Sequence, residues 1–438
     1  MNHILRKLYP LASIAAGACA LSVALPASAV DLKTADGSWT FSIDGNVNVD
    51  YIYSNCEKAD SAKAITDVGG ACVGSVGSNS TSSVANGLLP AAFTFGVATT
   101  QNGIDMAAHL GLYPGVVAND GGSPNIQASG PNNVALGTAG LDVRQVYMTF
   151  GNKDMGTFTL GRQIGLFEED IILNDMTLLG VGAPGAAATP NPANTTLGGI
   201  GFGYIYTDWL SQIDYTTPDF GGANLTAGIF SPLNSLTGPG TAAPKSAPGF
   251  HAKLAWKATF GDTKVYFSAT GIEQQQKYLP TPTTSGSWQG SGGDVFGKID
   301  MSGFELVAGG YYAKGLGTTG IFILGADAAG AARTSYGYLV QGTYKVGPTK
   351  LGIQYGVSRL AYANDADRAA DLLSGAPLVA ANEKVTGGVY YDLTKNLMLL
   401  GEISWVQDIA HVSTTSADGN FGNTNTGVTG NVGVFLAF

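Results

Sequence analysis

The sequence predicts an all-β protein, a transmembrane antiparallel β-barrel of about 16 strands. Three observations support this prediction: a strictly alternating segment at the C-terminus, a regular succession of short and long connections, and a composition that suits a membrane barrel. Successive side chains of a strand point to opposite faces, so one face can meet lipid while the other lines a polar interior. A closed ring of such strands leaves no unpaired edge inside the membrane.

The C-terminal segment, residues 426–438, alternates between apolar residues and small or polar ones, and it ends on Phe438. A terminal strand must pair with another strand or leave an open edge. The segment from Trp39 to Tyr53 alternates equally well, and we expect it to close the ring against the last strand. A terminal aromatic on an alternating strand also resembles the signal read by the barrel assembly machinery of the outer membrane.

Short and long connections follow one another along the chain. A barrel has short turns on its periplasmic side and long loops outside, whereas a soluble sandwich has no reason for this regularity. A soluble β-helix or adhesin is the alternative, but the chain has no fixed repeat period. The expected strands are 39–53, 88–99, 103–112, 141–150, 156–163, 200–217, 223–231, 250–260, 264–276, 294–300, 304–314, 336–346, 350–360, 384–392, 397–407 and 426–438, and the expected long loops are 54–87, 113–140, 164–199, 232–248, 277–292, 315–335, 361–383 and 408–425.

The first 29 residues have the pattern of a secretory signal peptide. Arg6 and Lys7 precede an apolar stretch, which ends in an A-x-A cleavage site at residues 27–29. Cleavage there would leave residues 30–438 as one barrel domain, exported to the outer membrane of a Gram-negative bacterium. A lipoprotein anchored at Cys19 is the alternative, although the residues after Cys19 stay apolar.

The composition fits a membrane barrel and excludes several other classes. Apolar residues make up 45%, yet no segment after residue 30 is long and apolar enough for a membrane helix. Charged residues, at 12%, are about half the usual share, and the 63 glycines are about twice the usual share. The net charge of −10 argues against nucleic acid as a partner.

The mature chain contains two cysteines, Cys56 and Cys72, in a segment rich in Gly, Ser and Asp. In an oxidising periplasm such a pair is expected to form a disulfide that staples a loop, and two unrelated free thiols are the alternative. A zinc site is disfavoured because the segment has no neighbouring His and no CxxC motif.

Catalytic and metal-binding motifs are absent from the sequence, so we expect neither an enzyme nor a cofactor. His109, His251 and His411 are far apart, and no HExxH, GxSxG or phosphate-loop pattern occurs. The glycine-rich run 199–203 opens an expected strand and not a helix, which excludes a phosphate cradle. Residues 364–367 could hold Ca²⁺, but a solvated acidic loop explains them better.

The segment 141–182 carries the most specific pattern. It contains Arg144-Gln145-Val146-Tyr147, then the run Gly156 to Arg162 that ends in Leu-Gly-Arg, and then a long loop with the pair Asp175-Met176. This pattern resembles the trimeric general porins of Gram-negative bacteria. Residue-level similarity is confined to about 144–176, while the strand count, signal peptide and terminal Phe extend the resemblance over the whole chain.

The resemblance implies roles for individual residues. The third long loop of these porins folds into the barrel and narrows it, which would place Glu168, Glu169, Asp170 and Asp175 at the constriction. Arg144 matches an arginine that faces this constriction, and Asp175 matches a loop carboxylate opposite it. Arg162 matches an arginine near the subunit interface, and its parity with Phe158 and Leu160 agrees with an outward direction. Ordinary strand-end charges are the alternative for both arginines.

The chain departs from the family in the basic half of the constriction. The expected second and sixth strands contain no arginine, and Asn46 stands where the family often has lysine. Parity instead places cations on the inner face of later strands. We therefore expect a lumen wall with His251, Lys253, Lys257 and Lys298, and the acidic loop predicts a mild cation preference unless its carboxylates are consumed by hydrogen bonds.

These observations favour a passive porin, a trimeric water-filled channel in outer-membrane lipid for ions and small hydrophilic solutes. The first alternative is a substrate-selective channel of the same architecture that binds an anion, sugar or aromatic acid through Lys253, Lys257 and Tyr266. The second is a non-channel barrel that acts as an adhesin or an enzyme through its loops.

Overall fold

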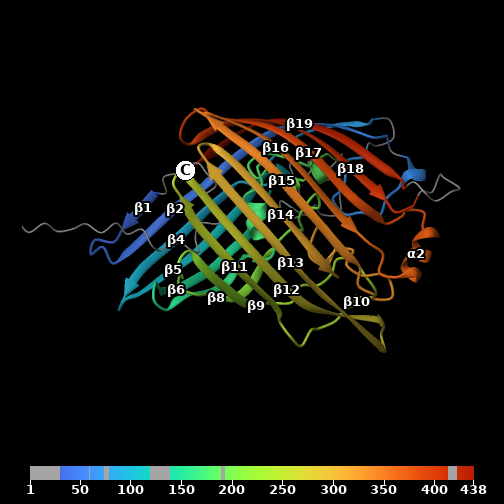
Figure 1. Cartoon of the computed structure of the whole chain (residues 1–438), viewed down its shortest axis with the longest axis horizontal. Helices are drawn as coiled ribbons and strands as arrows, with labels where there is room; N and C mark the ends of the chain where they lie inside the picture. The colour runs from blue at the N-terminus through green and yellow to red at the C-terminus, as the bar shows by residue number, and fades with distance from the viewer. Residues whose placement is uncertain (1–29, 59, 74–77, 119–138, 189–192, 413–421) are drawn as a thin grey trace, which may run out of the picture.

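The computed structural model describes residues 30–58, 60–73, 78–118, 139–188, 193–412 and 422–438, so the expected signal peptide and Cys19 lie outside the described residues. Within the described part, 16 long antiparallel strands pair in chain order into a closed barrel (Figure 1). They are β2 (Trp39–Cys56), β4 (Ala92–Gln101), β5 (Ile104–Ala118), β6 (Ala139–Asn152), β7 (Gly156–Ile164), β8 (Trp209–Thr216), β9 (Ala223–Phe230), β11 (Gly249–Phe260), β12 (Thr263–Thr281), β13 (Thr284–Met301), β14 (Phe304–Lys314), β15 (Thr334–Val346), β16 (Thr349–Leu360), β17 (Val379–Asp392), β18 (Leu397–Ala410) and β19 (Thr424–Ala437).

The last strand closes the barrel against the first long strand, as the alternation predicts. β19 pairs with β2 from Gly427 opposite Cys56 to Ala437 opposite Asn46. Gly45 and Phe438 exchange two backbone hydrogen bonds of 2.9 and 3.0 Å. A Cβ atom at Gly45 would lie 2.2 Å from the carbonyl oxygen of Ala92, so only glycine fits where the two strands meet β4.

The two ends of the barrel differ in their connections. At the short-turn end, Asn102-Gly103 and Ser302-Gly303 have positive φ at both positions, the geometry of tight hairpins that follows the twist of the strands. At the opposite, long-loop end lie the extended connections and the helix α2 (Asp365–Leu372) (Figure 1). The predicted alternation of short and long connections is confirmed except between β12 and β13, which a short turn joins.

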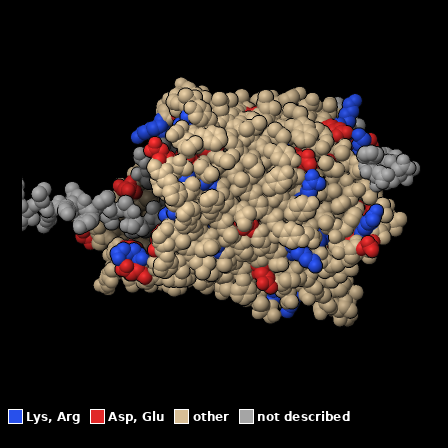
Figure 2. Space-filling model, viewed as in Figure 1, with Lys and Arg blue, Asp and Glu red and all other residues tan. Residues whose placement is uncertain are grey.

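The outer face of the barrel is apolar, as a lipid-facing surface requires. Large apolar side chains of alternate strand positions are exposed, for example Ile403 at 67% and Val432 at 64%, while their sequence neighbours point inward. Figure 2 shows a broad face on which charged side chains are few.

Two segments differ from the sequence prediction. The expected loop 277–292 is a continuation of β12 and β13, which stay paired as far as Thr281 opposite Thr284, and β10 (Thr241–Ala242) adds to β12. The many Gly, Ser and Thr residues there make the alternation of apolar and polar positions hard to recognise in the sequence. The expected strand 200–217 begins only at Trp209, because Gly201 and Gly203 adopt positive φ and turn the chain inside the barrel.

The remaining elements are short. β1 (Val30–Lys33) and β3 (Ser80–Ala85) pair with β2, and the helices are η1 (Ser61–Lys63), α1 (Glu169–Leu173), η2 (Gly185–Ala188) and α2. No helix in the described ranges has the length and apolar character needed to cross a membrane. In α2, Asp367 forms an ion pair with Arg333 at 2.7 Å and so is not free for a calcium ion.

Candidate pore constriction

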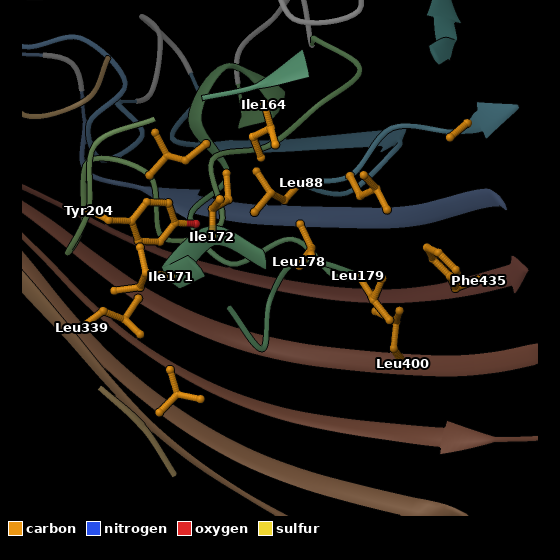
Figure 3. Packing of buried hydrophobic residues seen from close by; sticks show 14 of the residues in the cluster. Leu88, Ile164, Ile171, Ile172, Leu178, Leu179, Tyr204, Leu339, Leu400 and Phe435 are labelled. Carbon is orange, nitrogen blue, oxygen red and sulfur yellow. The ribbon is translucent and has the colours of Figure 1, made fainter. Parts of the chain in front are cut away.

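The connection between β7 and β8 folds into the barrel; its described residues, 165–188 and 193–208, are hereafter called the inner loop. Its apolar side chains pack against the inner wall: Leu179 lies beside Leu400, and Ile171 lies beside Tyr204 and Leu339 (Figure 3). Burial of one such side chain contributes roughly 1.5–3 kcal/mol, so the loop is held by packing as well as by polar contacts. This geometry is the inward-folded third loop that the family resemblance implied.

The inner loop presents α1 to the lysines of the wall. Glu168 precedes the helix with φ of 63°, and the chain then turns Glu169 and Asp170 toward β11. Lys253 Nζ lies 2.5 Å from Glu169 Oε2 and 3.4 Å from a carboxylate oxygen of Asp170. The two expected constriction acids therefore share an expected wall lysine, which offsets one of their two negative charges.

Further wall residues complete this contact. Asp170 also accepts hydrogen bonds from Tyr266 and from Ser268, the latter at 2.6 Å. Lys298 donates to the side chain of Asn174 at 3.0 Å and forms an ion pair with Glu305 at 2.6 Å. Contacts of Glu169, Asp170 and Asn174 thus fix α1 to three consecutive strands, β11 to β13.

Glu168 and Asp175 do not line open water, contrary to the sequence expectation. Asp175 is 4% exposed and accepts hydrogen bonds from Tyr204, Gln354 and Thr177, all between 2.7 and 2.8 Å. Glu168 is 2% exposed. Burial raises the pKa of Glu168 well above its ordinary value, and the nearby Asp294 carboxylate raises it further. Asp175 anchors the loop through its carboxylate, whereas Glu168 is held by its backbone amide, which donates to Asp294 at 3.0 Å.

Arg144 points into the barrel because of an irregularity in β6. The register between β5 and β6 shifts there, so Gly111 faces Gln145 and Leu112 faces Val143. The extra residue brings Arg144 to the inner face together with Gln145. Arg144 pairs with Asp142 at 3.0 Å and lies over the ring of Tyr113 at 5.2 Å. Its charge is satisfied within its own strand and not by Asp175.

Arg162 points outward and is exposed at the end of the β6–β7 pairing, opposite Val146. Beyond this pair, β6 and β7 separate. A cavity of about 560 Å³ lies there, lined in part by Arg144, Arg162 and Asp208. Burial raises the pKa of Asp208, and both arginines oppose this shift. Arg144, Arg162 and Asp208 thus line one cavity.

The expected wall residues all lie on the inner face, but they differ in their surroundings. His251 is 3% exposed and contacts Asp214 at 2.8 Å, so it is part of the packed wall. Lys257 is exposed in a cavity of about 600 Å³ at the short-turn end, hereafter the turn-side chamber. Its ionisable lining residues are Asp219, Lys257, Lys264, Tyr266, Lys298 and Asp300.

Several anchors of the inner loop are not indicated by the sequence. Glu402 accepts hydrogen bonds from the backbone of Val181 and Gly182 and from Tyr390, while Lys384 donates to the carbonyl of Gly198 at 2.7 Å. Parity indicates that Glu402 and Lys384 point inward, but no sequence signal identifies their partners, which are far away in the chain.

The structure joins Cys56 and Cys72 in a disulfide, with Cα atoms 5.2 Å apart. It joins the described part of the loop after β2 (residues 57–58, 60–73 and 78–79, hereafter the stapled loop) to the end of that strand. Among the described residues, no three of His, Cys, Asp and Glu come together as metal ligands.

Solved structures with the same fold are outer-membrane proteins. The outer membrane channel DcaP of Acinetobacter baumannii is 14% identical, with 93% of this chain and 99% of that chain covered and a TM-score of 0.60. OprB of Pseudomonas putida is 10% identical, with coverages of 91% and 94% and a TM-score of 0.54. The trimer form of OmpT of Vibrio cholerae is 15% identical, with coverages of 92% and 100% and a TM-score of 0.50.

A search of curated protein sequences finds no match. A family model described as Gram-negative porin matches residues 12–408, most of the chain, in agreement with the barrel, the inserted loop and the resemblance at 144–176. The chain therefore belongs to the Gram-negative porin family and is a diffusion channel of the outer membrane.

Proposed function

We propose that this porin is a general, weakly ion-selective channel that passes small hydrophilic solutes without binding or transforming them. The observation that carries the proposal is the balance of charge along the inner wall. Lys253 offsets one of the two charges of Glu169 and Asp170, and Glu168 and Asp175 are buried, so the acidic loop confers only a weak cation preference.

The turn-side chamber shows the same balance. Lys257, Lys264 and Lys298 are offset by Asp219, Asp300 and by Glu305, which pairs with Lys298. A pore wall with nearly equal numbers of both charges produces little net potential for either sign of ion. The pore is therefore expected to discriminate mainly by size.

A substrate-selective channel is the second candidate, and the turn-side chamber favours it. Lys257 and Tyr266 lie at its wall, as an anion-binding site would need. Lys253, which was expected in the same site, pairs with Glu169 instead. The remaining site would hold a small carboxylate between Lys257 and Lys264.

Single-channel recording in planar bilayers tests both candidates. The general porin predicts a conductance that rises linearly with salt, a reversal potential near zero in a potassium chloride gradient, and no saturable block by carboxylates. Block that saturates at micromolar concentration of one solute class would support the selective channel instead. Absence of conductance would contradict both.

We further propose a homotrimer in outer-membrane lipid, assembled through recognition of the last strand and Phe438 by the barrel assembly machinery. The trimer form of OmpT of Vibrio cholerae supports this assembly. Outward Arg162 supports it as well, because an arginine facing lipid costs up to about 2–4 kcal/mol. Light scattering of the purified protein should give three chains per particle, and R162L should lower the share of trimers. Trimers that persist unchanged in R162L would assign Arg162 to the cavity at β6 and not to a subunit contact.

A further inference from the structure

A cavity in the barrel wall is lined by charged side chains that the described part of the chain leaves unpaired. It is the cavity of about 560 Å³ beyond the pair Val146–Arg162 of β6 and β7, hereafter the wall cavity. Arg144 lines it from the inner face of the barrel and Arg162 from the outer face, so the cavity spans the wall. Pockets that hold one small organic molecule have volumes of roughly 300–1,000 Å³, so this cavity is large enough for such a ligand.

The lining of the wall cavity contains two arginines and two aspartates. Arg144 and Asp142 compensate each other in an ion pair of 3.0 Å. Arg162 and Asp208 form no ion pair, either with each other or with another described residue. Asp208 Oδ1 accepts a hydrogen bond from the amide of Trp209 at 2.6 Å, whereas Oδ2 has no donor among the described residues. One cation and one carboxylate of the lining are therefore available to a ligand.

The backbone holds the carboxylate of Asp208 in a fixed position. Asp208 has φ of 61°, in the left-handed region that Asp adopts more readily than most residues. Its carbonyl accepts a hydrogen bond from the amide of Gly165 at 3.0 Å, in addition to the contact of its Oδ1. A group that is already ordered loses little entropy when it binds a ligand.

Most of the remaining lining is apolar. One exception is Thr319, which is 7% exposed and whose hydroxyl has no hydrogen-bond partner among the described residues. Apolar walls with a few fixed polar groups are the usual form of a small-molecule pocket. The apolar residues of the lining include Leu197, Ile200, Trp209, Leu233, Ile321 and Ile323.

We infer that the wall cavity binds a zwitterion with an apolar body, of which an α-amino acid with a large apolar side chain is the simplest example. Arg162 binds the carboxylate, Asp208 binds the ammonium, and the apolar lining covers the side chain. An anion would place its charge beside Asp208, and a cation would place its charge beside Arg162, whereas a zwitterion compensates both. The inference does not rest on the general channel proposed above, because a molecule bound in the wall is not a solute in transit.

Three compounds with the same phenyl group test the two charges separately. L-phenylalanine carries both charges, phenylpropionate lacks the ammonium, and phenethylamine lacks the carboxylate. Equilibrium dialysis of the purified barrel with radioactive L-phenylalanine should show saturable binding of one molecule per chain. The other two compounds should each displace it at least about tenfold less well, because each leaves one charge of the cavity without a partner. Equal displacement by all three compounds, or no binding of phenylalanine at millimolar concentration, would overturn the proposal.

Variants assign the contacts. D208N should bind phenylalanine about as weakly as the unchanged protein binds phenylpropionate, and it should bind phenylpropionate no more weakly than before. Equal weakening of both compounds would contradict the contact between Asp208 and the ammonium. R162Q should weaken phenylalanine and spare phenethylamine; if light scattering shows fewer trimers in R162Q, D208N decides.

Two controls remove exposed charges of α2 at the same end of the barrel. D365N and R368Q should bind phenylalanine like the unchanged protein. The variants are compared only when they show the heat-modifiable gel mobility of a folded barrel. The comparison of the three compounds on the unchanged protein needs no variant, so it decides the proposal if D208N does not fold.

Discussion

Lys253 and Glu169 form the contact that attaches the inner loop to the barrel wall, with Nζ 2.5 Å from Oε2 and side chains that are 12% and 16% exposed. The same ammonium lies 3.4 Å from Asp170. One lysine thus serves two carboxylates in a largely buried position. Such a buried contact changes the stability little while it is complete, but removing one partner lowers the stability strongly.

Replacing this lysine should therefore release the inner loop. K253M leaves Glu169 and Asp170 without their cation, and the free energy of unfolding in urea should fall by about 3 kcal/mol. Fluctuations of the open-channel current should increase. K153M is the control, because Lys153 pairs with Asp154 on a solvent-exposed turn, and it should change neither quantity. Equal effects of the two variants would contradict the anchoring role of Lys253.

Asp175 should be equally important for the position of the loop. D175A leaves Tyr204, Gln354 and Thr177 as buried donors without an acceptor, and the unfolding free energy should fall by about 3 kcal/mol. Y204F removes only one of these hydrogen bonds and should cost about 1 kcal/mol. If Asp175 instead lined open water, D175A would shift the reversal potential and leave the stability unchanged.

The sequence was sufficient for the barrel because period-two alternation reports which face each residue occupies. This placed His251, Lys253, Lys257 and Lys298 on the inner face, where the structure has them. The alternation does not predict the direction of Arg144, because the irregularity that turns both Arg144 and Gln145 inward depends on pairing with β5.

The constriction itself could not be derived from local pattern. Whether Asp175 contacts water or protein depends on Tyr204 and Gln354. Gln354 lies 179 residues from Asp175 along the chain. The buried segment 200–208 is likewise apolar enough to resemble a strand, and only its packing inside the barrel distinguishes the two. Burial inside the lumen is a tertiary property, which explains why the acidic loop suggested a cation preference that its contacts reduce.

Glu168 should give the inner loop a pH dependence. Its pKa is raised by burial and by Asp294, so the folded protein binds this proton more tightly than the unfolded chain does. The free energy of unfolding should therefore fall as pH rises from the ordinary value of 4.5 to the raised pKa, by about 1.4 kcal/mol per pH unit. In E168Q this fall should be missing. The control E273Q changes an exposed carboxylate and should retain the wild-type dependence.

The disulfide should stabilise the barrel through the stapled loop. Closing a loop of this length, with a sequence separation of 16, removes conformational entropy from the unfolded chain equivalent to about 3 kcal/mol. The double variant C56S/C72S should lose about this amount in urea unfolding. A reducing agent should lower the stability of the unchanged protein to the same level and leave the double variant unaffected. Sensitivity of the double variant to the reducing agent would point to a different cause.

Ion selectivity should respond to the lysines of the turn-side chamber. Lys257 and Lys264 are exposed there and form no ion pair among the described residues, so their charges act on the permeating ions. K257Q/K264Q leaves the chamber acids in excess, and the reversal potential in a potassium chloride gradient should move toward cation selectivity by several millivolts, with little change in stability. K395Q removes an exposed lysine from a turn at the same end of the barrel and should leave the reversal potential where it was. An unchanged reversal potential in K257Q/K264Q would place the permeation path away from this chamber.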